Sequence, residues 1–189
     1  MTNEHTRLQR RPFLTPIWLL ALMALTAAVV LTGAVWLWVT ADSTVIVVVR
    51  HAEKVMDAGE DPPLNERGAA RAALLARLFG DAQRAGHVDA IYAPPDQRSR
   101  LTAAPLALRL GLTPADVPTD DPRGLARRVL HEHPGGRILI VGHGNTVPAI
   151  VAALSGASDI PPLGALDYGT LYIVTVPRLG HANYLRMTY

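Results

Sequence analysis

Apolar residues gather in two kinds of run along this chain. One is a single long stretch, Ile17 to Val39, that contains no charged residue. The others are short, such as Val45 to Val49 and Ile138 to Val141, and do not alternate with polar residues. Short continuous apolar runs are typical of parallel strands that are covered on both faces. The pattern therefore predicts one long apolar helix followed by an α/β domain.

The long apolar stretch predicts a membrane span. Its length of about 23 residues, at about 1.5 Å per residue, is enough to cross a bilayer core of about 30 Å. Trp18 lies near one end, and Trp36 and Trp38 lie near the other, where aromatic side chains meet the two membrane interfaces. We assign residues 16–40 to a transmembrane helix and residues 1–15 to a segment that precedes it.

Charged residues on either side of this stretch predict its orientation. Arg7, Arg10 and Arg11 come before it, whereas Asp42 follows it and no basic residue occurs before Arg50. The positive-inside rule then places the amino terminus in the cytoplasm. We expect a single-pass membrane protein with a signal anchor, whose catalytic domain is extracytoplasmic.

A cleaved signal peptide is the alternative to an anchor. The small residues of Val39-Thr40-Ala41 offer a site for cleavage. The apolar core of a signal peptide, however, covers only about 7 to 15 residues, so the length of this stretch favours the anchor. A buried core helix is the least favoured alternative.

Predicted strands and helices alternate after the span. The run Thr44 to Val49 is β-branched throughout, as expected of the central strand of a parallel sheet. Helices are recognised by capping residues, apolar stripes and terminal glycines. The other predicted strands are Val88–Tyr92, Arg137–Val141, Thr170–Val176 and Ala182–Met187, and the predicted helices are Asn65–Phe79, Arg98–Leu110, Pro122–His131 and Asn145–Leu154.

This alternation predicts the fold class of residues 44–189. We expect a three-layer α/β/α domain with a mostly parallel central sheet, preceded by one transmembrane helix. The last two strands are close in sequence, so they are expected to form a hairpin at the edge of the sheet. Ligands of such folds bind beyond the carboxyl ends of the parallel strands.

Composition narrows the possible functions. The net charge is only +2 and the basic residues are scattered, so nucleic acid is not an expected partner. The chain has no cysteine, which excludes disulfides, thiolate nucleophiles and thiolate metal ligands. Every basic residue except Lys54 is an arginine, so an arginine needs support from its position before it is assigned to a site.

Two of the buried strands are followed by histidine. Arg50 and His51 end the first strand, and His143 comes directly after the strand Arg137–Val141 and Gly142. Because parallel strands end at the same edge of a sheet, we expect these three side chains to share one site. Imidazole can attack phosphorus and guanidinium can hold phosphoryl oxygens, so the pattern indicates phosphoryl chemistry.

Four segments, taken in order, carry a resemblance to a known family. They are Arg50-His51-Ala52-Glu53-Lys54, Pro63-Leu64-Asn65-Glu66-Arg67-Gly68, Arg98-Ser99-Arg100-Leu101-Thr102-Ala103 and Gly142-His143-Gly144-Asn145-Thr146-Val147-Pro148. With them, residues 44–189 resemble the histidine phosphatase superfamily, the phosphoglycerate-mutase-like proteins, and especially its small phosphatases with an Arg-His-Ala-Glu motif. The chain departs from the pattern at Ala93-Pro94-Pro95-Asp96, where many relatives have a serine and a short polar turn.

The resemblance implies catalysis through a phosphohistidine. His51 is then the nucleophile, while Arg50, Arg98 and His143 surround the phosphoryl oxygens. Asn145, at the start of the helix after His143, is either a further phosphate ligand or a helix cap. This mechanism requires no metal and no cofactor.

The leaving oxygen needs a proton donor, and two carboxylic acids are candidates. Glu53 lies just beyond the nucleophile, and Asp121 is the second candidate. His131-Glu132-His133 has the composition of a metal site, but residues i and i+2 diverge on a helix, so a structural position is favoured. Gly142-x-Gly144 is not a dinucleotide loop, because Val147 stands where the third glycine belongs.

The short segment Ala52-Glu53-Lys54 replaces the longer one with which mutases of the family hold their substrate. We therefore expect hydrolysis of a phosphomonoester, from a phosphorylated small molecule or envelope component, outside the cytoplasm. One alternative is a non-catalytic phosphate-binding or scaffold domain. Another is a phosphohistidine protein phosphatase, if the domain faces the cytoplasm.

Overall fold

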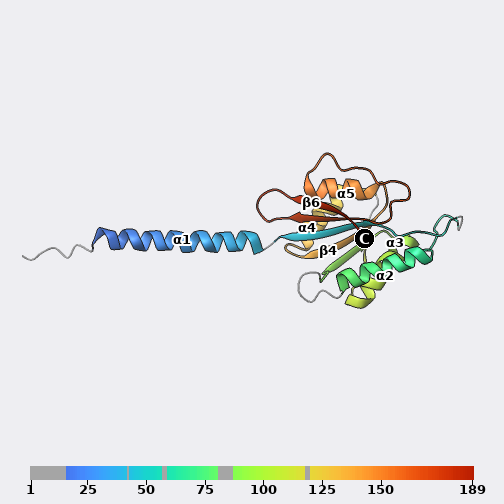
Figure 1. Ribbon diagram of the computed structural model, residues 1–189, viewed down its shortest axis with the longest axis horizontal. Helices are drawn as coiled ribbons and strands as arrows, with labels where there is room; N and C mark the ends of the chain where they lie inside the picture. Colours follow the sequence, from blue (N-terminus) through green and yellow to red (C-terminus); the bar gives the residue numbers. More distant parts are fainter. Residues whose placement is uncertain (1–15, 42, 57–58, 81–86, 118–119) are drawn as a thin grey trace, which may run out of the picture. The chain divides into compact units, whose positions relative to one another are not determined.

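The computed structural model describes residues 16–41, 43–56, 59–80, 87–117 and 120–189. It divides after Trp38 into a unit that contains an amino-terminal helix and a unit that forms an α/β domain (Figure 1).

Helix α1 (Ile17–Ala41) forms over the predicted apolar stretch. From Ile17 to Trp38 it is long and apolar enough to cross a membrane, and this part of the helix is exposed. The hydroxyls of Thr26 and Thr32 donate to the carbonyls of Met23 and Ala28, so their polar groups are satisfied within the helix. A membrane anchor and a signal sequence share these properties.

The α/β domain is built on a six-stranded mixed sheet with the strand order β3-β2-β4-β1-β5-β6. The first four strands in this order are parallel, while β5 is antiparallel to β1 and forms a hairpin with β6. The strands are β1 (Thr44–Arg50), β2 (Ala90–Ala93), β3 (Ala115–Asp116), β4 (Arg137–Gly142), β5 (Thr170–Val176) and β6 (Asn183–Thr188).

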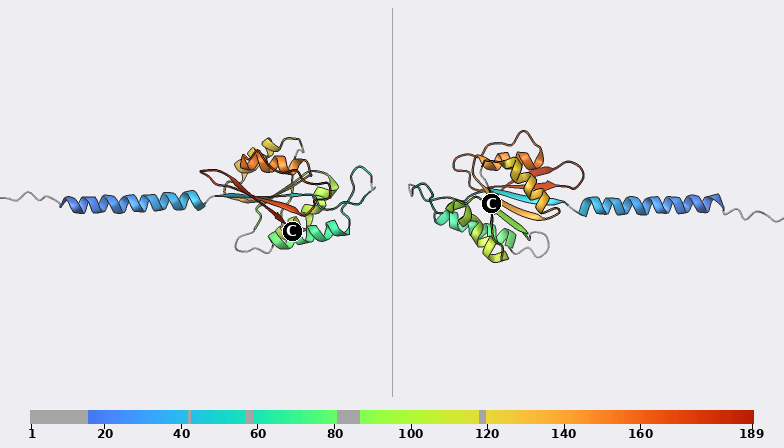
Figure 2. Two further views of the ribbon diagram at one scale, coloured as in Figure 1. Left: turned by 45° about the horizontal axis from the view of Figure 1, so that its top comes forward. Right: turned by 180° about the vertical axis from the view of Figure 1, so that it is seen from behind.

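Helices cover both faces of this sheet, as Figures 1 and 2 show. On one face α2 and α3 pack on Val47 and Val49 of β1, and on the other face α4 and α5 pack on Ile46 and Val48. The alternation of side chains along a strand explains why β1 contributes to both cores and is apolar throughout. The helices are α2 (Glu66–Gly80), α3 (Gln97–Leu110), α4 (Pro122–Glu132) and α5 (Thr146–Ser155).

The predicted fold class is therefore confirmed, with the first strand inside the sheet and the last two strands at one edge. Two details of the prediction were wrong. Strand β2 begins two residues later than predicted, at Ala90, and the two-residue strand β3 was not predicted. Ala115 and Asp116 form no apolar run, so only their pairing with β2 reveals them as a strand.

Helix caps fix where the functional segments leave the sheet. The side chains of Asn65, Asp96 and Asp121 accept the backbone N–H groups of Gly68, Ser99 and Gly124, each three residues further on. Each therefore stops the preceding loop and begins a helix. The loops that begin after β1 and β2 thus return to the domain at defined residues.

Candidate active site

The pairing of β1 with β4 brings the two predicted histidines together. Arg50 lies beside Gly142 in the register, and the N–H of His51 donates to the carbonyl of Gly142 at 2.8 Å. The rings of His51 and His143 follow at the same edge of the sheet, with their centroids 5.4 Å apart and an angle of 64° between their planes. Two segments about 90 residues apart in sequence therefore form one site.

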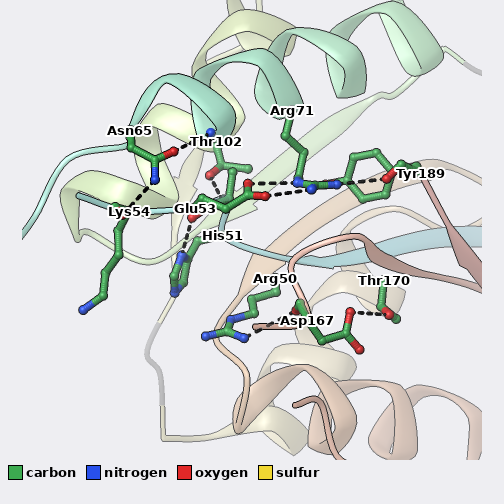
Figure 3. Close-up of polar contacts among 12 residues, drawn as sticks. Arg50, His51, Glu53, Lys54, Asn65, Arg71, Thr102, Asp167, Thr170 and Tyr189 are labelled. Carbon is green, nitrogen blue, oxygen red and sulfur yellow. Dashed lines mark hydrogen bonds and ion pairs between the residues drawn. The ribbon is translucent and has the colours of Figure 1, made fainter. Parts of the chain in front are cut away.

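His51 is buried and held by its own backbone. Its Nδ1 lies 2.8 Å from the carbonyl oxygen of Ala52, which can only accept, so Nδ1 carries the hydrogen (Figure 3). Burial lowers the pKa of His51 to about 4, the positive charges of Arg50, Arg98 and His143 act in the same direction, and the bond to Ala52 opposes them. The imidazole is thus neutral near pH 7, and the Nε2 lone pair is available.

Helix α3 supports the backbone next to the nucleophile. The N–H of Ala52 donates to the hydroxyl of Thr102 at 2.9 Å, and this hydroxyl donates to the carbonyl of Arg98 at 2.8 Å. Thr102 is fully buried. Its hydroxyl links the residue after His51 to the first turn of the helix that carries Arg98, so a displacement of α3 would displace both.

Arg50 is anchored by the loop before β5. Its Nη1 donates to the carbonyls of Gly164 and Ala165, each at 3.0 Å, and its guanidinium carbon lies 4.2 Å from the centre of the Tyr168 ring. In the same loop, the hydroxyl of Thr170 donates to the Asp167 carboxylate at 2.7 Å (Figure 3). The Nε of Arg50 is buried and has no hydrogen-bond partner among the described residues, so it keeps a donor for a ligand.

Arg98 and His143 share a carboxylate, that of Asp96. Oδ1 of Asp96 lies 3.4 Å from Nε of Arg98, and Oδ2 lies 3.3 Å from Nε2 of His143. Burial alone raises the pKa of Asp96, but the hydrogen bonds from His143 and Ser99 outweigh it and bring the pKa well below its ordinary value. Asp96 is therefore ionised and accepts the hydrogen of the imidazole.

The involvement of Asp96 was not predicted from the sequence. It lies in Ala93-Pro94-Pro95-Asp96, the segment in which the sequence departs from the family pattern. An acidic residue that caps the helix of Arg98 was visible in the sequence. Its contact with His143, 47 residues later, depends on β2 and β4 being neighbours in the sheet.

The contacts of Glu53 do not suit the role of proton donor. Its two carboxylate oxygens accept from Nε and Nη2 of Arg71, at 2.9 and 2.7 Å (Figure 3). Hydrogen bonding to Arg71, which outweighs the opposite effect of burial, lowers the pKa of Glu53. A proton donor needs the opposite shift, so these contacts argue against Glu53 in that role.

The other candidates lie in less direct positions. Asp121 caps α4 by accepting from Gly124 at 2.7 Å, and it lines a groove between α4 and α5. Asn145 is the N-cap residue of α5, but its side chain makes no capping hydrogen bond. The hydroxyl of Thr146 instead accepts the N–H of His143 at 2.8 Å and fixes the start of this loop.

Two residues of the His131-Glu132-His133 segment contact a buried tyrosine. Glu132 and His133 contact the hydroxyl of the buried Tyr92, at 2.6 and 2.9 Å. Across the described ranges, no group of three His, Asp or Glu side chains lies in an arrangement that could hold a metal ion.

The sequence matches one family model over part of the chain. Residues 46–121 match the histidine phosphatase superfamily, branch 1. This range includes Arg50, His51 and Arg98, whereas His143 lies beyond it. No curated protein matches the chain.

Solved structures share the fold of the α/β domain. The protein histidine phosphatase SixA, solved with tungstate, has a TM-score of 0.62 at 20% identity, over 76% of this chain and 96% of that chain. A mycobacterial glucosyl-3-phosphoglycerate phosphatase has a TM-score of 0.60 at 15% identity, over 78% and 98%. A mutant phosphoserine phosphatase from Entamoeba histolytica, in complex with phosphoserine, has a TM-score of 0.56 at 16% identity, over 75% and 94%.

At these identities the structural likeness concerns the fold. The family match rests on the sequence, and its range contains most of β1 and all of α3, with Arg50, His51 and Arg98. Residues 46–121 thus match the histidine phosphatase superfamily, and the α/β domain shares the fold of solved phosphatases.

Proposed function

We propose that the domain hydrolyses phosphomonoesters through a phosphohistidine on His51. The observation that carries this proposal is the state of His51, a buried neutral imidazole whose Nδ1 is bound to Ala52 and whose Nε2 is available. The family match and the phosphatases among the structural neighbours support a phosphatase hydrolase.

In the first step, Nε2 of His51 attacks phosphorus. The new N–P bond forms as the P–O bond to the leaving group breaks, and the departing oxygen takes a proton. Arg50, Arg98 and His143 are the cations that act electrostatically on His51, so they are placed to stabilise the charge of the transferring phosphoryl group.

We assign the donation of a proton to the leaving oxygen to the Asp96–His143 pair. The carboxylate of Asp96 contacts one of the two site histidines, whereas that of Glu53 is paired with Arg71. Because the pKa of Asp96 is low, the carboxylate is the acceptor and the proton resides on the imidazole. In the doubly protonated ring of His143, Nε2–H stays on the ionised Asp96, which orients the ring, and the Nδ1 proton passes to the leaving oxygen, so that a neutral imidazole remains.

In the second step, water attacks the phosphohistidine. The water gives one proton to His143, its oxygen bonds to phosphorus, and the N–P bond breaks so that Nε2 of His51 regains its lone pair. Inorganic phosphate leaves and the site returns to its starting state. Every acid, base and cation in these steps belongs to the chain itself.

We further propose that α1 anchors the domain to a membrane and that the domain acts on the extracytoplasmic side. The length and apolar character of the helix support an anchor, and the arginines before it support the orientation. The substrate would then be a phosphorylated small molecule or envelope component. Protease digestion of sealed vesicles of known orientation tests the side, because a cytoplasmic domain would favour a phosphohistidine protein phosphatase instead.

Trapping the intermediate tests the activity. The full chain in detergent is incubated with a ³²P-labelled phosphomonoester in EDTA, quenched and examined for acid-labile, base-stable label. We expect label that is lost in His51→Ala and kept in His181→Ala, which removes an exposed histidine. Label that survives in His51→Ala would refute the assigned nucleophile. Saturable phosphate binding without label or release would favour a non-catalytic binding domain.

A further inference from the structure

A cavity lies next to His51, and its lining residues take no part in the proposed phosphoryl transfer. It has a volume of about 410 Å³ and is built from the segment after His51, the first turn of α2 and the loop before β5. Its lining residues are Glu53, Lys54, Met56, Asn65, Arg67, Leu166 and Tyr168.

This cavity lies close to the imidazole of His51. Tyr168 lines it, and the ring of Tyr168 is also 5.9 Å from the ring of His51 and in contact with Arg50. Figure 3 shows the Lys54 side chain extending in the same direction as the ring of His51. The cavity therefore adjoins the ring that would carry the phosphoryl group.

The backbone of Lys54 is held in place. It pairs with Leu64 in an isolated antiparallel bridge, and its carbonyl accepts from Nδ2 of Asn65 at 3.2 Å (Figure 3). Asn65 is also the residue that caps α2, the helix that carries Arg67 in its first turn. The segment after the nucleophile and the start of α2 thus form one connected wall of the cavity.

The charge of this wall is positive. Its one carboxylate, that of Glu53, is neutralised by two hydrogen bonds from Arg71. Lys54 and Arg67 have no ion pair with a carboxylate in the part of the chain that the structure describes. Lys54 and Arg67 therefore bring two cations to the lining, against one carboxylate that is already paired with Arg71. Lys54 is also the single lysine in a chain whose other basic residues are arginines.

We propose that this cavity is a leaving-group subsite for phosphomonoesters whose alcohol carries a second anionic group, a carboxylate or a phosphate. The ammonium of Lys54 and the guanidinium of Arg67 bind that anion, and the apolar side chains of Met56 and Leu166 contact the carbon chain. This assignment rests on the proposed function, because it uses the orientation of an ester bound at His51.

Three substrates of matched length test the subsite. They are propyl phosphate, the phosphate ester of 3-hydroxypropionate and 1,3-propanediol bisphosphate, so that the far end is neutral, a carboxylate or a phosphate. The full chain in detergent is assayed for phosphate release, and kcat/KM for each anionic substrate is divided by that for propyl phosphate. We expect this ratio to be about fivefold or more above one for the preferred anion, the size of a partly exposed ion pair.

Substitutions connect the ratio to the two cations. Lys54→Met and Arg67→Met are each expected to lower the ratio about fivefold, whereas Arg77→Met, an exposed arginine on the same helix, is expected to leave it unchanged. Comparison of the two anionic substrates shows whether the subsite takes a carboxylate or a phosphate.

The outcomes separate this inference from the proposed function. If all three substrates are hydrolysed and the ratio of their kcat/KM values is the same in the wild type and in every variant, the subsite is refuted and the proposed phosphatase activity stands. Hydrolysis of none would refute the proposed function, and the ratio of dissociation constants from calorimetry, measured for the same ligands and variants, would then decide on the subsite. Equal affinities for the neutral and anionic ligands would refute it.

Discussion

The Asp96 carboxylate lies 3.3 Å from Nε2 of His143 while its other oxygen accepts the N–H of Ser99 as the cap of α3. One side chain therefore begins the helix that carries Arg98 and orients the second histidine. The geometry makes the position of α3 and the orientation of His143 interdependent.

Replacing Asp96 by Asn tests its role with the fold preserved, because Asn caps a helix as well as Asp does. We expect kcat/KM for an alkyl phosphate to fall about a hundredfold, the usual contribution of a positioned proton donor. The loss for p-nitrophenyl phosphate should be less than about fivefold, since its leaving group departs without a proton. Steady-state kinetics with both substrates measure the difference.

Asp121→Asn is the matched control for this experiment. It makes the same change of charge at the cap of α4 and is expected to keep both activities within about twofold of the wild type. A large loss in Asp121→Asn, selective for the alkyl phosphate, would identify Asp121 as the donor instead.

Glu53→Gln should affect stability more than catalysis. The substitution removes the charge that accepts two hydrogen bonds from Arg71, which is worth about 1 to 3 kcal/mol. Because Arg71 lowers the pKa of Glu53, this stabilisation is present above the ordinary pKa of 4.5 and is lost as pH falls through the lowered value. We expect a lower melting temperature at pH 7, a smaller difference at acidic pH and less than about a tenfold loss of kcat. A larger loss of kcat at unchanged stability would restore Glu53 as a catalytic candidate.

The neutral state of His51 predicts how stability changes with pH. A folded pKa of about 4 against an ordinary value of 6.5 means that the unfolded chain binds more protons between these values, so stability falls as pH falls through this window. The two values correspond to a loss of about 2 kcal/mol between pH 8 and pH 5. His51→Gln should remove this part of the pH dependence.

Denaturation followed by tyrosine ellipticity measures it selectively, because all five tyrosines lie in the α/β domain and all three tryptophans lie in α1. An equal pH dependence in the wild type and in His51→Gln would contradict the buried neutral imidazole.

Gly68→Ala should destabilise the domain, although alanine is favoured over glycine within a helix by about 1 kcal/mol. A Cβ at Gly68 would overlap the backbone carbonyl of Glu53, which already accepts the N–H of Asn65 at 3.0 Å. We expect a loss of about 1 to 3 kcal/mol and reduced activity, as the segment after His51 shifts. Gly80→Ala is the control, since its Cβ would meet only the side chain of Arg109. A stabilised Gly68→Ala variant would contradict this packing.

The arrangement of the two histidines could be predicted from the sequence because it depends on strands. Uninterrupted β-branched runs identify buried parallel strands, and the residues that follow such strands gather at one edge. The pairing of β1 and β4 then makes His51 and His143 neighbours. Helices with clear caps and terminal glycines, such as α3 before Gly111, were predicted to within one or two residues.

The partners of the charged side chains could not be predicted in the same way. Arg71 was indistinguishable from the other arginines of α2 until the helix was placed against Glu53. The carbonyls of Gly164 and Ala165 that hold Arg50 carry no side-chain signal at all. Such contacts depend on the direction in which loops return to the domain, which hydrophobic periodicity does not encode.

The register of β1 and β4 also has a consequence for how this scaffold accepts change. Because backbone hydrogen bonds of the sheet set the separation of the two imidazoles, the reactive pair does not rely on the lengths of the surrounding loops. The segments that line the leaving-group cavity, by contrast, are mostly outside the sheet. Segments transplanted from another protein at these positions would alter which molecules are accepted while the reactive centre keeps its alignment. The domain is therefore suited to redirecting substrate choice by loop exchange.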